Sequence, residues 1–210
     1  MRFRDRADAG RQLAAALRAL RLRAPLVLGL PRGGVPVAAV VADVIGGELG
    51  VVVARKIGAP GHPEFGIGAI AEHGGSVVDE RTVAALRIPP DVYDDLVRSE
   101  REELERRVQR YRAGAPAPDP ADRDVVVVDD GIATGVTARA ALLGLRTRRP
   151  ERLVMAAPVG APDSVAELES CADRVVCILQ PGDFHAVGAW YVDFRQTTDD
   201  EVCRLLGRAA

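Results

Sequence analysis

The sequence predicts an α/β protein with a doubly wound, mainly parallel sheet that carries helices on both faces. Short apolar runs alternate with helical patterns along most of the chain, which is typical of parallel strands joined by helical crossovers. Four consecutive valines, Val125–Val128, are typical of a strand buried on both sides. At 210 residues, of which 48% are hydrophobic, the chain has enough material for one domain with a substantial core.

The first half of the chain predicts a helix, a strand–helix–strand unit and then short strands. Leucines at helical spacing indicate an amphipathic helix over about the first twenty residues, which Pro25 ends. The other elements expected before residue 113 are strands over 26–30, 50–55, 67–72 and 76–78 and helices over 35–45, 79–86 and 90–112.

A proline-rich connector over 113–122 separates this half from the second, which again alternates strands and helices. An aromatic segment, Phe184–Phe194, precedes the last helix. The expected elements are strands over 124–128, 152–157 and 174–178 and helices over 137–148, 162–172 and 199–206.

Composition argues against several classes of protein. Twenty-eight basic and thirty acidic residues give a net charge of −2, so no overall positive field attracts nucleic acid or an anionic membrane. The charged run over 105–112 is interpreted as a solvated helix face. Three cysteines without a C-x-x-C pair favour free thiols over a disulfide framework or a zinc site. No apolar run suits a signal peptide or a membrane span, so we expect a cytoplasmic location.

The segment Val125–Thr137, VVVVDDGIATGVT, carries the most functional information. Asp129 and Asp130 follow the valine strand, at the edge where ligands bind in open α/β sheets. Residues 134–137 then lie where the loop becomes a helix, and free N–H groups of a first helical turn can hold a phosphate. Taken alone, the acidic pair is equally compatible with Mg²⁺ in a phosphatase or with a simple turn cap.

The segment Leu30–Gly34, LPRGG, follows the first strand of the predicted sheet. It is compatible with an ordinary turn between strand and helix. Arg32 beside two glycines also offers a guanidinium fork and exposed N–H groups, which match the oxygens of a pyrophosphate.

The thirteen-residue segment resembles the phosphoribosyl pyrophosphate signature of type I phosphoribosyltransferases: an apolar run, two acids, and a loop ending in T-G-x-T. The resemblance implies one phosphoribosyltransferase domain over 1–210, with a core over about 25–180 and a small hood over about 181–210, to which the N-terminal helix contributes. It also implies that Asp129 and Asp130 contact the ribose hydroxyls. The residues implied to wrap the 5′-phosphate are Ala133, Thr134, Gly135, Val136 and Thr137.

Four further residues match the parts of this family that hold pyrophosphate. Arg32 and Gly33 fall in the pyrophosphate loop, where a non-proline cis peptide is common, so one is expected near Arg32. Arg55 and Lys56 resemble the Arg-Lys pair at the mobile loop of adenine phosphoribosyltransferases and leave the second strand for a Gly- and Pro-rich loop. Lys56 is the only lysine of the chain, which favours a specific role over chance.

The aromatic segment allows two interpretations, core packing or a lid over a planar base. It resembles the C-terminal part of hypoxanthine phosphoribosyltransferases, with one extra residue in its spacing. This implies that Trp190 and Tyr191 lie on the base side of the hood. It also implies that Asp193, together with Asp130, faces a Mg²⁺ ion held largely by the donor.

The resemblance implies transfer of 5-phosphoribosyl from phosphoribosyl pyrophosphate to a nitrogenous acceptor, with release of pyrophosphate. The candidate catalytic residues are Lys56, Asp130 and Glu72, the last because it falls where related enzymes carry a glutamate that handles the base. Ala133 replaces the acid of 6-oxopurine enzymes, which disfavours hypoxanthine and guanine. The alternative is a non-catalytic sensor of the same donor. A diphosphokinase that makes the donor fits poorly, and a homodimer is compatible with the resemblance.

Overall fold

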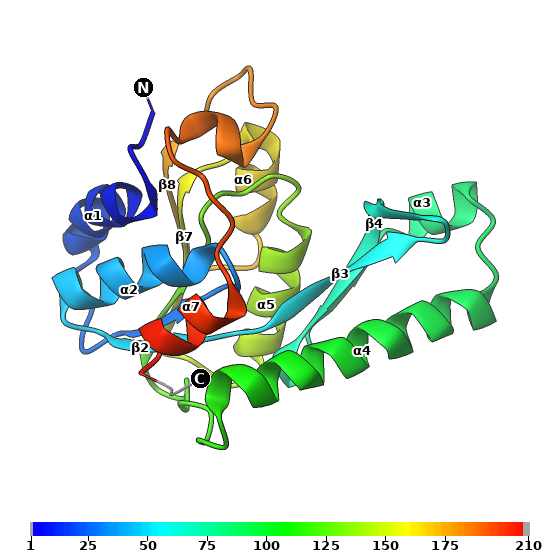
Figure 1. Ribbon diagram of the computed structural model, residues 1–210, viewed down its shortest axis with the longest axis horizontal. Coiled ribbons are helices and arrows are strands. Elements are labelled where there is room, and N and C mark those ends of the chain that lie inside the picture. Colours follow the sequence, from blue (N-terminus) through cyan, green and yellow to red (C-terminus); the bar gives the residue numbers. More distant parts are fainter. Residues whose placement is uncertain (1, 208–210) are drawn as a thin grey trace.

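A sheet of five parallel strands forms the centre of the computed structural model, which describes residues 2–207 (Figure 1). Its strand order is β2-β1-β6-β7-β8, and every neighbouring pair is parallel. The strands are β1 (Leu26–Gly29), β2 (Glu48–Val51), β6 (Asp124–Val128), β7 (Arg152–Val159) and β8 (Arg174–Leu179). The strand order reverses between β1 and β6, so the predicted doubly wound sheet is confirmed.

Helices cover both faces of this sheet, and the valine run of β6 shows why. Val126 and Val128 are buried among side chains of α1 (Arg6–Leu17) and α2 (Gly34–Ile45). Val125 and Val127 are buried on the other face, among side chains of α5 (Val136–Arg146) and α6 (Pro162–Leu168). Successive side chains of a strand point to opposite faces, so a continuous apolar strand is needed between two helical layers.

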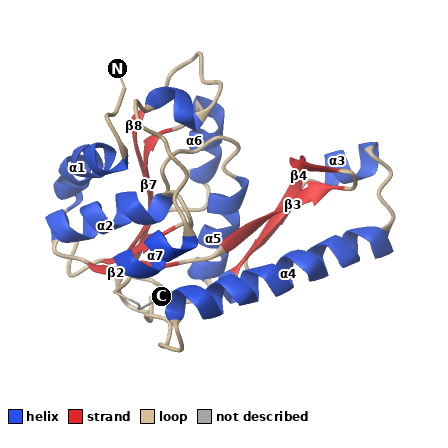
Figure 2. Cartoon of the chain, in the orientation of Figure 1, coloured by secondary structure: helices blue, strands red, loops and turns tan. Residues whose placement is uncertain are grey.

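A second, antiparallel sheet projects from the central layers and is visible as a long hairpin beside the longest helix (Figure 2). We call residues 54–112 the arm. Its elements are β3 (Ala54–Ala59), β4 (His62–Ala71), η2 (Glu72–Gly74), β5 (Ser76–Val78), α3 (Glu80–Ala85) and α4 (Pro90–Arg112).

The prediction of a Gly- and Pro-rich loop after Lys56 is wrong, because these residues pair as the β3–β4 hairpin. Its glycines serve the pairing: a Cβ at Gly58 would overlap the backbone of Pro63, and the register shifts beside Gly58. Likewise the single strand expected over 50–55 is two strands, β2 and β3, in two different sheets. The short strands expected around residues 73–75 are confirmed by the pairing of β4 with β5.

Helix α4 has the predicted bounds and the predicted solvated face. Pro90 stands at its first position, where a missing N–H costs nothing. Leu104 and Tyr111 bury one side of the helix against β3, β4 and the C-terminal helix. On the solvent side, Glu103 receives hydrogen bonds from Arg106 and Arg107.

The N-terminal end of the described chain pairs with the aromatic segment that precedes the last helix. Phe3 bridges to Tyr191 and donates its N–H to the carbonyl of Trp190 at 2.8 Å. The remaining elements are η1 (Arg18–Leu20), η3 (Val187–Trp190) and α7 (Asp199–Leu205). Residues 1 and 208–210 of the expected domain lie outside the described residues. Within 2–207, no helix combines the length and the apolar character that crossing a membrane requires.

Candidate functional site

Two loops meet where the strand order of the central sheet reverses. The loop over 30–33 leaves β1, and the loop over 129–135 leaves the adjacent strand β6. The contact between the loops is close enough to require glycine: a Cβ at Gly33 would overlap Oδ2 of Asp130, and one at Gly34 would overlap the carbonyl of Val128. Sequence reasoning placed both loops at this edge, where ligands bind in sheets of this kind.

The acidic pair lies partly buried at the carboxyl end of β6. The backbone N–H of Asp130 donates to Oδ1 of Asp129 at 2.8 Å. Burial raises the pKa of Asp129 well above its usual range, and the neighbouring Asp130 charge adds to this. Burial also raises the pKa of Asp130, against the opposing effect of Arg6. A buried carboxylate pair favours a ligand that brings hydroxyl donors or positive charge.

Arg6, which sequence reasoning missed, binds Asp130 from the start of α1. Its Nε and Nη2 donate to Oδ2 of Asp130 at 2.9 and 2.7 Å, and its Nη1 donates to the carbonyl of Arg195 at 2.7 Å. Its guanidinium carbon lies 4.1 Å from the centre of the Phe194 ring. No sequence signal joins residues 124 positions apart, so only the fold reveals this pair.

The turn before α5 presents a row of free backbone donors. Gly135 adopts φ +69°, which lets the chain enter the helix tightly, and Ser164 donates to the carbonyl of Ala133 at 2.7 Å. Over residues 133–138, no backbone N–H donates to another group of the described chain. Free N–H groups at a helix start are suited to an anion.

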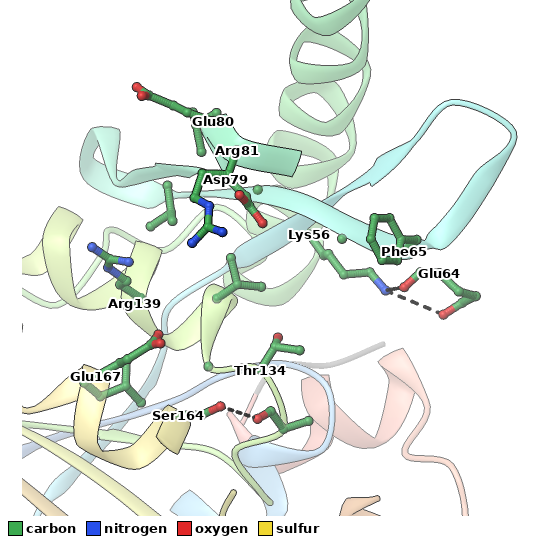
Figure 3. A pocket seen from close by; sticks show the side chains of 18 residues that line it. Lys56, Glu64, Phe65, Asp79, Glu80, Arg81, Thr134, Arg139, Ser164 and Glu167 are labelled. Carbon is green, nitrogen blue, oxygen red and sulfur yellow. Dashed lines mark hydrogen bonds and ion pairs between the residues drawn. The ribbon is translucent and has the colours of Figure 1, made fainter. Parts of the chain in front are cut away.

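These donors open into a cavity of about 930 Å³ between the central layers and the arm (Figure 3). Residues 133–136, Arg139 and Glu167 form one wall, and the arm forms the other. Figure 3 shows Lys56 directed toward Glu64, to whose carbonyl its ammonium donates at 2.8 Å. Arg81 and Arg139 add two guanidinium groups to the lining that the motifs did not reveal.

Arg32 lies on a separate, smaller hollow. The Pro31–Arg32 peptide is cis, so the cis bond expected near Arg32 is confirmed. Arg32 and Gly33 line a hollow of about 310 Å³ together with Arg6 and Asp130. Arg32 Nη1 is 3.9 Å from Oδ1 of Asp199. The structure therefore brings Arg32 beside the acidic pair, while Lys56 and residues 133–136 line the larger cavity.

Two candidate residues are turned away from both spaces. Arg55 donates through Nε to Glu100 of α4 at 2.8 Å, on the face of β3 opposite Lys56. Glu72 is 8% exposed and accepts from Arg112 at 2.7 Å. Burial raises the pKa of Glu72, and Arg112 opposes this. Arg55 joins β3 to α4 and Glu72 joins η2 to α4. The expectation that Arg55 holds pyrophosphate and Glu72 handles the base therefore gains no support from their positions.

The aromatic segment forms a small core of its own. Tyr191 is buried between Phe3 and Phe194, with ring centres at 5.5 and 4.9 Å. Its hydroxyl donates to the carbonyl of Asp130 at 2.6 Å, and burial raises its pKa. Trp190 packs half-buried against this cluster. Tyr191 is 4% exposed, as the core-packing interpretation expects. The base-side position implied for Trp190 and Tyr191 stays a prediction.

The side chain of Asp193 hydrogen-bonds within its own segment. It is exposed, and its Oδ1 accepts from the N–H of Arg195 at 3.1 Å. No group of three His, Cys, Asp or Glu side chains that could hold a metal ion occurs within residues 2–207. An ion that enters on a diphosphate needs few protein ligands, so the expectation that Asp130 and Asp193 face a Mg²⁺ ion held largely by the donor stays a prediction.

Comparison with known proteins identifies relatives along almost the whole chain. Two curated proteins, from two strains of Mycobacterium tuberculosis, are each 46% identical over 207 residues, and their names assign them provisionally to the phosphoribosyl transferases. The match covers 99% of this chain and 47% of theirs, so the chain spans about half the length of these curated relatives.

A solved structure and a family model agree with this match. The crystal structure of TT1426 from Thermus thermophilus is 48% identical, with a TM-score of 0.82 over 98% of each chain. The family model described as the phosphoribosyl transferase domain matches residues 4–195, which includes both loops at the sheet edge and the segment over 184–195. The chain therefore belongs to the phosphoribosyl transferase family.

Proposed function

We propose that this protein transfers a 5-phosphoribosyl group from phosphoribosyl pyrophosphate to a nitrogenous acceptor. The bond from the anomeric carbon to the pyrophosphate oxygen breaks, a bond from that carbon to an acceptor nitrogen forms, and pyrophosphate leaves. The observation that carries the proposal is the meeting of three features at one sheet edge: the acidic pair, the free N–H groups over 133–138, and the Arg32 turn.

The ribose is assigned to the acidic pair. Positive charge builds on the sugar ring as the bond breaks, and fixed anions nearby stabilise it. Asp129 and Asp130 are anchored at the end of a buried strand, so they need little rearrangement to act. Asp130, as the acid nearer the free space, is proposed to be catalytic.

The 5′-phosphate is assigned to the turn before α5. Ala133, Thr134, Gly135, Val136 and Thr137 offer backbone N–H groups and two hydroxyls there. A phosphate held at this turn leaves most of the large cavity for the rest of the substrates.

Pyrophosphate is assigned to cations on the two sides of the acidic pair. Arg32 and Gly33 stand beside Asp130, and Lys56 stands across the larger cavity. Negative charge that develops on the leaving group is stabilised there. Mg²⁺, bound to the diphosphate of the donor, would neutralise part of the same charge. Arg55 would have to leave Glu100 to contribute.

The test is pyrophosphate release from the donor with purines, pyrimidines and pyridine acids as acceptors, run beside a donor-binding titration in Mg²⁺. We expect saturable donor binding and release with at least one acceptor, not hypoxanthine or guanine, because Ala133 cannot exchange a proton with a base. Donor binding without release on any acceptor would identify a sensor, and absence of donor binding would contradict the proposal altogether.

A further inference from the structure

Arg6 occupies an unusual place at the proposed ribose site, because it comes from the first turn of the N-terminal helix. Two of its donors converge on one oxygen, Oδ2 of Asp130. A third donor and the Phe194 ring hold the rest of the guanidinium. The side chains of Arg6 and Asp130 are only 12% and 13% exposed, so this pair is shielded from solvent and salt.

The polar atoms of Asp130 are almost all engaged by other parts of the fold. Its N–H donates to Asp129, its carbonyl accepts from Tyr191, and its Oδ2 accepts from Arg6. The missing side chain of Gly33 leaves room for Oδ2 on that side. Oδ1 accepts no hydrogen bond from any of the residues over 2–207.

We propose that Arg6 is a positioning residue of the donor site, which fixes Oδ2 of Asp130 so that Oδ1 is presented to a ribose hydroxyl. The inference rests on the proposed function. A guanidinium suits the task because its planar fork fixes orientation as well as charge, whereas an ammonium supplies charge alone. In this arrangement the N-terminal helix contributes to the donor site through the carboxylate of Asp130.

Two other roles for the pair predict different behaviour. If Arg6 only stabilises the fold, its loss lowers the unfolding temperature without a specific effect on the donor. If Arg6 blocks the acid, its loss tightens donor binding. Positioning instead predicts weaker donor binding that depends on Asp130.

The experiment compares Arg6→Ala and Arg6→Lys with Arg11→Ala, a matched control on the same helix whose side chain is 52% exposed. Readouts are the donor Kd, the KM for donor and for acceptor, and thermal unfolding. We expect Arg6→Ala to raise the donor Kd about tenfold or more, the effect of one hydrogen bond to a charged group. The acceptor KM should stay constant, Arg6→Lys should be intermediate, and added guanidinium should restore donor binding to Arg6→Ala.

A double-mutant cycle shows whether Arg6 acts through Asp130. In an Asp130→Asn background, Arg6→Ala should cause no further change in the donor Kd, because the oxygen that it positions is already altered. Additive effects would reject the positioning role, and so would a donor Kd for Arg6→Ala equal to or below that of the wild type. If Arg6→Ala fails to fold, Arg6→Lys in the same cycle decides the matter.

The outcome also separates this inference from the function on which it rests. A wild-type protein that binds the donor while Arg6→Ala binds it equally well overturns the role of Arg6 alone. A wild-type protein that binds no donor overturns both.

Discussion

Arg55 and Lys56 are neighbours on β3, yet Arg55 donates to Glu100 of α4 while Lys56 lies in the wall of the large cavity. The alternation of side chains along a strand separates them. A pair of adjacent basic residues in the sequence therefore has two roles in the fold: one joins the arm together, and the other faces the space proposed for the substrates.

We expect Lys56→Ala to lower kcat about tenfold or more while the donor Kd changes less, because a charge on the leaving group develops mainly in the transition state. Arg55→Ala should mainly lower the free energy of unfolding, by about 1 kcal/mol, the scale for a partly exposed ion pair. Steady-state kinetics, donor titration and urea unfolding of both variants test this. A larger loss of turnover in Arg55→Ala than in Lys56→Ala would reverse the assignment.

Gly33→Ala should weaken donor binding and destabilise the fold. The backbone at Gly33, with φ −65°, accepts any residue, so the effect is steric: the new Cβ would overlap Oδ2 of Asp130. Overpacking of this kind costs about 1 to 3 kcal/mol. The control is Gly182→Ala, where no atom lies within 4 Å of the added Cβ. Equal donor Kd and unfolding temperature in the two variants would show that the loops can separate freely.

Glu72→Ala should reduce stability and leave turnover largely intact in the folded fraction. The substitution leaves Arg112, whose side chain is 19% exposed, without its carboxylate partner. An unpaired, largely buried charge of this kind costs about 2 to 3 kcal/mol. Urea unfolding and kcat at saturating substrates provide the measurement. A specific loss of kcat at unchanged stability would instead restore Glu72 to the reaction, as the family resemblance implies.

Asp124→Asn should lower stability at neutral pH by about 2 kcal/mol, because the buried carboxylate accepts from Arg152 at 2.7 and 2.6 Å. These hydrogen bonds lower the pKa of Asp124 below 3.8. A carboxylate whose pKa is lower in the folded state than in the unfolded state stabilises the fold at any pH above its unfolded-state pKa. This stabilisation is lost as the pH falls through its folded-state pKa.

The contribution of Asp124 can therefore be tested by measuring the unfolding free energy at acidic pH. Unfolding free energies of the wild type and Asp124→Asn should converge as the pH falls below 3.8. The exposed Asp119, whose side chain is 68% accessible, provides the control: Asp119→Asn should follow the wild type throughout. A constant gap between wild type and Asp124→Asn over this range would contradict the linkage.

The central sheet was predictable from sequence because its signals are local. Four valines require burial on both faces, and Pro90 marks a helix start. The position of the two loops at one sheet edge follows from the direction of the strands, so the proximity of Gly33 to Asp130 could be predicted from the sequence. The roles implied for the site residues remain predictions.

The remainder depends on contacts that no local pattern encodes. The β3–β4 hairpin was mistaken for a loop because its glycines, which suggested flexibility, instead allow close backbone approach. Glu72 was placed by analogy at the base, but the fold pairs it with Arg112, 40 residues away. Arg6 gave no signal at all, since its partner Asp130 is 124 positions away in the sequence.

The large cavity lies between two parts of the fold, because the arm supplies one wall and the loop and helices after β6 and β7 supply the other (Figure 3). The width of the cavity thus depends on how the arm is seated on α5, where Gly75 lies close against the carbonyl of Ala140 and Gly144 close against the carbonyl of Glu72. Substitutions at that contact are therefore expected to change the width of the cavity without altering any residue that lines it.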